Sequence, residues 1–476
     1  MSPEDQPVSQ TIKQSNQQAL IDLFVRTLGA AYVLTGEAIE PKYKTDWQHT
    51  AVREPLVVLR PADTEQVSAI MKICHQYDHC VTVQGGMTGL VAGGLPEDGQ
   101  VVISMERLNG VEEIDPAASS MTVWAGTPLQ LVQEAATKAD LYFAVDLGAR
   151  GSCQVGGNIS TNAGGNRVIR YGMMREQILG LEVVLADGTI VTSLNKMLKN
   201  NAGYDLKQLF IGSEGTLGII TRAVLRLHAR TPGYFTAFCA LATPDAAVQF
   251  LAHLKQTGGA LMSYEVMWPD FYDFMTLRVP GIRTPLPTRA EAYALIELAT
   301  DLSEHDQIRY SALLEAAMEE GWVTDAAIAQ SGKEAADFWR LRDAVSEFPV
   351  LWSPYRGYDI SLPIGDMSRF VASLQAAFTA EFPTSEYAHF GHIGDSNLHV
   401  VIHVPGSRAQ FPAASIDACV YEMVRKFGGS ISAEHGIGLN KKKYLHYSRN
   451  ESEMALMKLI KSTLDPKNLL NPGKVL

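Results

Sequence analysis

Three glycine-rich segments, each next to an apolar run, constrain the fold of this chain more than any other feature. They cover residues 84–94, 151–165 and 212–220, and each also contains serine, threonine or asparagine. Glycine lets backbone N–H groups approach an anion without a Cβ clash, and hydroxyl groups add further donors. Neither G-x-G-x-x-G after the first strand nor GxxxxGK[ST] occurs, which disfavours a Rossmann dinucleotide site and a P-loop. We predict that the loops together hold a pyrophosphate.

The segments around these loops alternate between strand and helix patterns. A strand, a helix, a second strand and the first glycine loop predict an α/β unit. The expected strands are 56–59, 81–83, 101–104 and 121–124, and the expected helices are 64–77 and 128–139. Residues 181–191 predict a hairpin with a tight Asp-Gly turn.

The chain after residue 233 contains fewer glycines, and a Thr-Pro-Gly sequence at 231–233 marks the boundary. Between strands, long helices are expected at 246–256, 290–300, 310–320 and 333–346, as in an α+β domain. A chain of 476 residues is too long for one core. We divide it into the parts 1–50, 51–230, 231–430 and 431–476.

Two histidines and a later acidic residue form a second pattern. The segment GHIGDSNLH places turn formers between apolar runs, which predicts a hairpin. If Asp395 and Ser396 form its tip, His392 and His399 lie opposite each other with Cβ atoms about 5 Å apart. Two such imidazoles can share a divalent metal, and Glu434 can complete three protein ligands. The alternative is a pair of histidines that only satisfy hydrogen bonds near a turn.

The charge balance excludes some kinds of partner. Lys and Arg number 40 against 52 Asp and Glu, a formal net charge of −12, so nucleic acid and acidic membrane surfaces are poor partners. No run reaches about eighteen apolar residues, and the polar start lacks an apolar signal core. We therefore expect neither a transmembrane segment nor a secretory signal. Five scattered cysteines without CxxC spacing indicate a reduced, cytoplasmic protein.

Several segments resemble one flavoprotein superfamily. GSCQVGGNISTNAGG, RYGMMREQILGLEVVLADG and IGSEGTLGIIT resemble the FAD-binding domain of the vanillyl-alcohol-oxidase/p-cresol-methylhydroxylase superfamily. With GHIGDSNLH, SAEHGIG and NPGKV, nearly the whole chain resembles the FAD-dependent D-2-hydroxyacid dehydrogenases. That group includes D-2-hydroxyglutarate dehydrogenase, D-lactate dehydrogenase and the flavin subunit of glycolate oxidase. QGGMTGLVAGG followed by SMERLN favours the hydroxyglutarate branch.

The resemblance implies an α+β protein. Residues 51–230 would form a two-subdomain FAD-binding domain, and 231–430 a substrate domain with an antiparallel sheet. Residues 1–50 would be a helix and tail, and 431–476 would return to the FAD-binding domain.

The resemblance also implies which residues bind FAD. Binding would be non-covalent, because the first loop has neither His nor Cys, although Cys153 lies in the second. The assigned residues are Gln84, Gly85, Gly86, Met87, Thr88, Gly89, Leu90, Gly151, Ser152, Gly156, Gly157, Asn158, Thr161, Asn162, Gly164, Gly215, Ile220 and Asn471.

For catalysis, the resemblance implies hydride transfer from a D-2-hydroxy acid to flavin N5. His435 would be the general base, and a divalent metal would lower the proton affinity of the substrate hydroxyl. Arg342 would bind the substrate carboxylate, and Ser346 would supply a hydroxyl from one helical turn later on the same face. The alternative for Arg342 is a surface salt bridge. The ligands of the metal, zinc or alternatively manganese, would be His392, His399 and Glu434.

Two positions depart from the hydroxyglutarate pattern and leave the substrate open. That branch has a lysine where this chain has Gly357 and an asparagine where it has Val401. Arg356 or Tyr355 could replace the lysine, and a smaller or more apolar D-2-hydroxy acid is equally consistent. Electrons would pass to a quinone or an electron-transfer flavoprotein. The alternative is an oxygen-using oxidase or a glycolate oxidase-like flavin subunit, and a homodimer is the commonest assembly.

Overall fold

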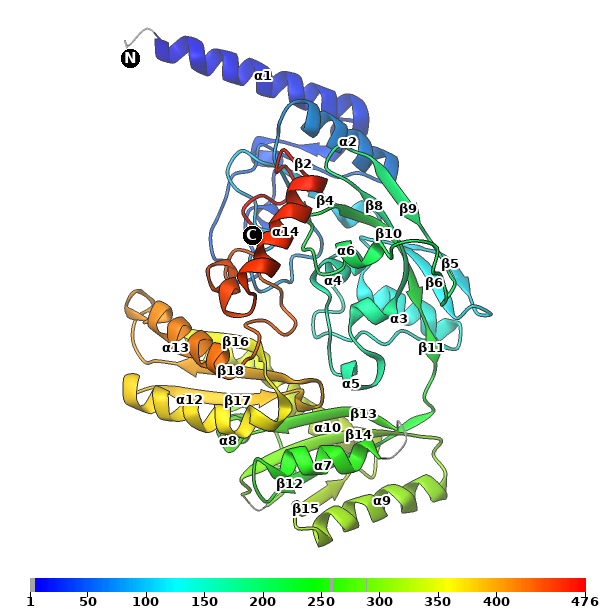
Figure 1. Ribbon diagram of the computed structural model, residues 1–476, viewed down its shortest axis with the longest axis vertical. Coiled ribbons are helices and arrows are strands. Elements are labelled where there is room, and N and C mark those ends of the chain that lie inside the picture. The colour runs from blue at the N-terminus through cyan, green and yellow to red at the C-terminus, as the bar shows by residue number, and fades with distance from the viewer. Residues whose placement is uncertain (1–4, 257–259, 288) are drawn as a thin grey trace.

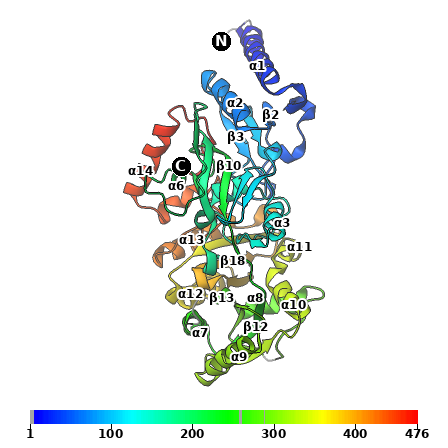
Figure 2. The same cartoon turned by 90° about the vertical axis from the view of Figure 1, so that its right-hand side faces the viewer.

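The structure is a computed structural model that describes residues 5–256, 260–287 and 289–476. Figure 1 shows two lobes: an upper lobe, formed by residues up to 229 and the C-terminal segment, and a lower lobe, formed by residues 233–434. Helix α1 (Asp5–Leu28) projects from the upper lobe, as Figure 2 also shows. Among the described helices, none combines the length and the apolar character that crossing a membrane requires.

The upper lobe begins with a four-stranded sheet. Strands β2, β4 and β3 run parallel, and α2 (Thr64–Gln76) supplies the crossover between β2 and β3. Asp63 caps this helix, because its side chain accepts a hydrogen bond from the backbone N–H of Gln66. The predicted α/β unit is therefore confirmed. In sheet order, the strands are β1 (Val33–Leu34), β2 (Val57–Leu59), β4 (Val101–Ser104) and β3 (Val81–Gln84).

A five-stranded antiparallel sheet completes this lobe. Its strands β8 and β9 form the predicted hairpin, with Asp187-Gly188 in the turn. In order the strands are β5 (Val111–Asp115), β6 (Ser120–Trp124), β10 (Ile219–Arg226), β8 (Ile178–Val184) and β9 (Ile190–Ser193). The remaining elements are α3 (Leu129–Lys138), α4 (Val155–Thr161), α5 (Val168–Tyr171), α6 (Lys207–Phe210) and the strand pair β7 (Leu141–Tyr142) and β11 (His228–Ala229).

The lower lobe is built on a seven-stranded antiparallel sheet. In order its strands are β15 (Val323–Ile328), β12 (Gly233–Leu241), β14 (Ala292–Thr300), β13 (Leu261–Met267), β17 (Glu386–Gly391), β18 (Asn397–His403) and β16 (Tyr355–Ser361). Its helices are α7 (Ala246–Lys255), α8 (Pro269–Arg278), α9 (Glu304–Glu319), α10 (Gly332–Asp343), α11 (Phe348–Leu351), α12 (Met367–Glu381) and α13 (Ala413–Lys426).

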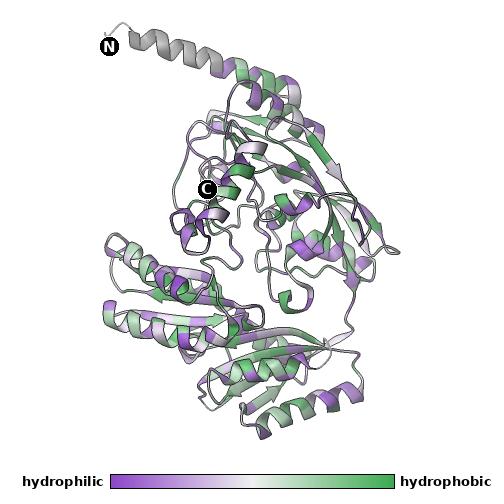
Figure 3. Cartoon of the chain, in the orientation of Figure 1, coloured by the Kyte–Doolittle hydropathy of each residue, from purple (hydrophilic) through white to green (hydrophobic). Residues whose placement is uncertain are grey.

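Helices cover both faces of this sheet. One buried cluster joins Phe250 of α7 and Phe370 of α12 to one face, and another packs Phe271 and Phe348 on the other. In Figure 3 the helices carry both hydrophobic and hydrophilic residues, as expected for helices with one face against a sheet.

The burial of both faces explains one wrong prediction. The sequence pattern predicts a helix at residues 290–300. They form β14, which lies between β12 and β13 and is buried on both sides. A fully buried central strand has no polar face, so its apolar run resembles that of a helix.

The chain ends in the upper lobe. After α14 (Glu451–Leu464), the backbone N–H of Val81 donates to the carbonyl of Leu469, and the N–H of Asn471 donates to the carbonyl of Val81. The last residues thus lie beside β3. The predicted α+β class, with two subdomains in the upper lobe and an antiparallel sheet below, is confirmed.

Candidate active site

The hairpin that carries the two histidines exists, but its tip is longer than two residues. Phe390 of β17 pairs with His399 of β18, and a short 3-10 turn at Ile393–Asp395 connects the strands. The N–H of Asp395 donates to the carbonyl of His392, which closes the turn locally. His392 therefore lies just outside the ladder, so the prediction that it stands directly opposite His399 is wrong.

The tertiary structure nevertheless brings the predicted ligands together. The rings of His392 and His399 are 5.5 Å apart and nearly perpendicular. Ligand atoms of His392, His399 and Glu434 all lie within 4.8 Å of one another. Glu434 comes from the C-terminal segment, and its Oε1 accepts a hydrogen bond from the backbone N–H of Gly165 at 3.1 Å. The three side chains therefore meet where the lower lobe faces the upper lobe.

Glu265 on β13 contacts Nδ1 of His392 and so orients its imidazole ring. The Oε1 atom of Glu265 lies 2.5 Å from Nδ1 of His392, and its Oε2 accepts from Nε of Arg342 at 2.7 Å. This pairing turns Nε2 of His392 away from Glu265 and toward Nη2 of Arg342 and the other predicted ligands. Burial alone would lower the pKa of His392, but the Glu265 carboxylate outweighs it and raises that pKa to about 9. Burial opposes ionisation of Glu265 too, yet His392 and Arg342 lower its pKa to about 2.

Asp359 on β16 organises the other side of the site. Its Oδ2 accepts the backbone N–H groups of Glu434 and His435 at 2.9 and 3.0 Å, and lies 3.6 Å from Nδ1 of His435. Nδ2 of Asn397 donates to Oδ1 at 2.7 Å. Burial would raise the pKa of this carboxyl, but His435 and Lys441 hold it well below its usual range. Asp359 thus keeps a negative charge beside His435.

Arg342 lies in the last turn of α10, and Ser346 follows the end of this helix. Arg342 is 5% exposed and its Nη2 lies 3.3 Å from Nε2 of His392. The alternative of a surface salt bridge is therefore wrong. The helix ends at Asp343, and Ser346 is exposed on the following 3-10 turn. A 3-10 helix has three residues per turn instead of 3.6, so a residue four positions on is rotated away from the first. The prediction that Ser346 shares one helical face with Arg342 is therefore also wrong.

The first two glycine loops pack against each other in the upper lobe. A Cβ on Gly86 would lie 1.9 Å from the carbonyl oxygen of Ser152, so only glycine permits this contact. Likewise, a Cβ on Gly164 would lie 2.7 Å from Oε1 of Glu434. The second loop therefore reaches from the first glycine loop to the cluster of His392, His399 and Glu434.

Comparison with known proteins identifies the family. Residues 55–193 match the model of an FAD binding domain. Residues 235–475, more than half of the chain, match the C-terminal domain of FAD linked oxidases. The chain belongs to the FAD-linked oxidase family.

Similar proteins cover nearly the whole chain. A D-2-hydroxyglutarate dehydrogenase of Xanthomonas citri pv. viticola is 40% identical over 443 residues, 91% of this chain and 92% of that protein. The mitochondrial D-2-hydroxyglutarate dehydrogenase of Bos taurus is 34% identical over 478 residues, 100% of this chain and 87% of the relative.

Solved structures show the same fold at low identity. p-Cresol methylhydroxylase with substrate bound has a TM-score of 0.74 at 16% identity and covers 97% of both chains. An alkyldihydroxyacetonephosphate synthase also has a TM-score of 0.74, at 15% identity, and covers 94% of this chain and 84% of its own. The two-subdomain FAD-binding architecture is confirmed.

In this FAD-linked oxidase, the geometry of the loops fits the cofactor. Within the described residues, the backbone N–H groups of 85–89 donate to no protein acceptor. A Cβ on Gly89 or Gly157 would meet nothing within 4 Å. Free N–H donors beside open space suit a pyrophosphate.

Several side chains assigned to FAD instead hold the loops themselves. Nε2 of Gln84 donates to the carbonyls of Tyr43 and Gly94, and Oδ1 of Asn162 accepts from the N–H of Arg175. Asn471 accepts from the N–H of Val83 and donates to the carbonyl of Glu214. Thr161 donates to the carbonyl of Gly157, and Asn158 to the sulfur of Cys153. These side chains shape the site, while backbone groups face the open side of the first loop. Their contacts with FAD stay a prediction.

Sequence reasoning missed three charged residues of this site. They are Glu265, Asp359 and Lys441, all buried. An acid within the apolar strand LMSYEVM was the available signal for Glu265, because charged residues are rarely buried without a partner.

Proposed function

We propose that this FAD-linked oxidase converts a D-2-hydroxy acid to the 2-oxo acid and passes the electrons to a quinone or an electron-transfer flavoprotein. The observation behind this proposal is the position of Glu434. Its side chain lies within 4.8 Å of ligand atoms of His392 and His399, and it also accepts from the N–H of Gly165. A substrate bound there would contact the FAD-binding lobe and the sheet together. The D-2-hydroxyglutarate dehydrogenases that are 34–40% identical support the substrate class.

The chain offers a suitable donor set for a metal. Two imidazoles and one carboxylate leave a coordination position open for substrate, as in catalytic zinc sites. Zinc or manganese, when bound there, would lower the proton affinity of the substrate hydroxyl. Glu265 contributes by orienting the ring of His392.

His435 is the proposed base. Its imidazole accepts the hydroxyl proton of the substrate, and the carboxylate of Asp359, 3.6 Å from Nδ1, stabilises the imidazolium that forms. FAD, when bound, supplies the hydride acceptor for the α-hydrogen. Because Glu434 and His435 are neighbours, the same backbone segment presents one metal ligand and the base.

Arg342 is proposed to bind the substrate carboxylate. Its Nε donates to Glu265 and its Nη2 contacts His392, so a substrate carboxylate would bind Nη1 or take Nη2 over from His392. Nη2 lies 3.3 Å from Nε2 of His392 and thus faces the ligand cluster. A carboxylate at this position would gain a charge-assisted hydrogen bond.

Anaerobic bleaching of the bound flavin tests the proposal. The purified flavoprotein is mixed with D- and L-2-hydroxy acids, with and without a metal chelator. We expect rapid bleaching by a D-acid, loss of bleaching on chelation and recovery with zinc or manganese. Bleaching that persists in demonstrably metal-free protein would remove the metal from the mechanism. Peroxide formation in air at the rate of turnover would identify oxygen, rather than a quinone or flavoprotein, as the acceptor.

A further inference from the structure

The strand register places a second row of residues beside the ligand cluster. In the first row, Asp359, His399 and Phe390 pair across β16, β18 and β17. In the next row, Gly357 pairs with Val401, and Val401 with Ala388. Residues two positions apart in a strand share a face and lie about 6.6 Å apart. We call this second row the 357–401–388 row. Its residue Val401 lies on the same face of the sheet as His399, about 6.6 Å along the strand.

The 357–401–388 row is apolar, and only its Gly357 end is exposed. Ala388 is fully buried and Val401 is 6% exposed, in one cluster with Phe390 and Trp352. Gly357 is exposed, and a Cβ built on it would meet only the ring of Tyr355, at 4.0 Å. A substrate side chain that extends over this row meets carbon atoms and the free space at the glycine.

The other direction along the sheet is closed. Asn397, two residues before His399, is 3% exposed and donates to Asp359. The C-terminal segment pairs with the same end of β16 through Ser361 and Ser430. The 357–401–388 row is therefore the direction left for the substrate side chain.

The cations near the row are already paired. Arg356 is next to Gly357, but strand alternation turns it to the opposite face, where two of its nitrogens donate to Asp417 at 2.8 Å each. The expectation that Arg356 could replace the missing lysine is therefore wrong. Lys441 donates to the carbonyl of Asp359 and to Oγ of Ser432.

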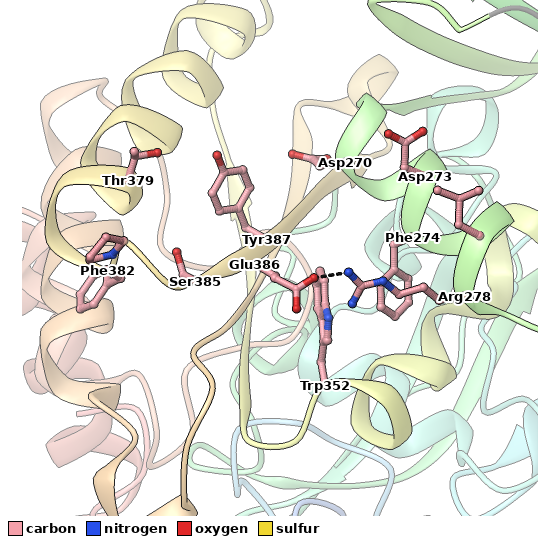
Figure 4. Close-up of a pocket in the computed structure, with 12 residues that line it drawn as sticks. Asp270, Asp273, Phe274, Arg278, Trp352, Thr379, Phe382, Ser385, Glu386 and Tyr387 are labelled. Carbon is pink, nitrogen blue, oxygen red and sulfur yellow. Dashed lines mark hydrogen bonds and ion pairs between the residues drawn. The ribbon is translucent and has the colours of Figure 1, made fainter.

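The charged groups at the outer end of the same face are already paired. In the third row Glu386 pairs with His403, and its side chain borders a pocket of about 310 Å³ between α8, β17 and α12 (Figure 4). Arg278 of this pocket is paired with Glu386, Asp273 is paired with Arg289, and Asp270 lies 2.6 Å from Nδ1 of His389. Among the described residues that line this pocket, a second carboxylate on the substrate would find no unpaired cation.

We propose that the 357–401–388 row selects D-2-hydroxy acids with an uncharged, apolar side chain over those with a second carboxylate. The inference rests on the proposed function. Apolar carbon gains free energy when it leaves water, whereas a carboxylate desolvated without a partner loses it. Gly357 and Val401 determine this specificity together, since neither supplies a donor.

The test compares two acids of similar size on the FAD-loaded enzyme, D-2-hydroxy-4-methylpentanoate and D-2-hydroxyglutarate. We expect kcat/KM to be at least about tenfold higher for the first acid. In Gly357→Lys the ratio should shift toward the diacid by about tenfold or more, through KM rather than kcat. Gly365→Lys, which adds the same charge at an open glycine on the 3-10 turn Ile364–Asp366 outside this row, should leave the ratio unchanged.

Equilibrium binding provides a second readout. Calorimetry with the matching 2-oxo acids should show the same preference in the wild type, even if the lysine variant fails to fold. If the wild type has an equal or higher kcat/KM for the diacid, or binds its 2-oxo acid equally or more tightly, the inference is overturned. The proposed function would still stand. If neither D-acid reduces the flavin, the proposed function falls and the inference with it.

Discussion

At the scale of single residues, two buried carboxylates organise the candidate site. Glu265 is bound by His392 and Arg342, and Asp359 by the backbone N–H groups of Glu434 and His435. Burying a carboxylate is costly unless cations or hydrogen bonds compensate. Here the compensating groups are those proposed for catalysis, so the same contacts stabilise the fold and orient the reacting side chains.

The proposed base can be tested alone. His435→Gln should lower kcat by about 10²–10⁴-fold, because the hydroxyl proton loses its acceptor. FAD should stay bound, because His435 contacts Asp359 and His399 of the lower lobe. His403→Gln is the control, because Nδ1 of His403 donates to the carbonyl of Pro354 at the far end of β18. A His435→Gln variant with near wild-type kcat would contradict the assignment.

A second residue, Lys474, predicts a pH dependence of stability. Burial lowers its pKa to about 7, although Glu97 and Glu214 oppose this. Between pH 7 and 10.5 the unfolded chain keeps the proton that the folded protein has lost, so stability rises with pH by about 1.4 kcal/mol per pH unit. Lys474→Met removes this contribution. The variant should have the higher Tm at pH 7, and the difference should shrink by pH 9; a constant difference would refute the prediction.

At the scale of elements, β13 links the site to the centre of the sheet. Glu265 lies on this strand, which pairs with β14 on one side and with β17 on the other. The β17–β18 hairpin supplies both histidines, and Glu265 of β13 orients His392. The direction of this predicted ligand therefore depends on a strand that neighbours the hairpin as well as on its own turn.

Glu265→Gln tests this link. The amide cannot compensate the charge of Arg342 and holds His392 more weakly, so zinc affinity should fall about 10–100-fold. KM for the hydroxy acid should rise as well. The measurement is chelator competition on the flavin-loaded protein. Glu386→Gln serves as control, because Glu386 is half-exposed and pairs with Arg278 outside the site. Unchanged zinc affinity would show that Glu265 is only structural.

At the scale of the whole molecule, the site depends on how the lobes meet. The C-terminal segment is tied to the upper lobe by Glu214, which accepts the N–H groups of Ile437 and Gly438 at 2.7 and 2.8 Å. On the other side, α5 contacts β13, and Oγ of Ser263 donates to the carbonyl of Asn166. These contacts hold Glu434 and His435 between the two lobes.

Glu214→Ala should therefore affect stability and catalysis together. It leaves the part-buried N–H of Ile437 and the buried N–H of Gly438 without their carboxylate acceptor, which costs about 1.5–3 kcal/mol for each bond. We expect a lower Tm and a lower kcat, because residues 434–435 are no longer fixed. Glu113→Ala, which removes an exposed ion pair with Lys196, should change neither. A normal kcat in Glu214→Ala would show that the segment is positioned by other contacts.

The sequence alone determined those features that depend on neighbours along the chain. The helix at 64–77, the glycine loops and the hairpin with its two histidines follow from local geometry, and the motif resemblance named Glu434 as the third ligand. Only the tertiary structure decided the four-residue turn after His392, the strand at 292–300 and the face of Arg356. It also decided that Glu265 meets His392 across 127 residues. Such contacts depend on strand order and register, which no local pattern encodes, because a shift of one residue turns every side chain to the other face.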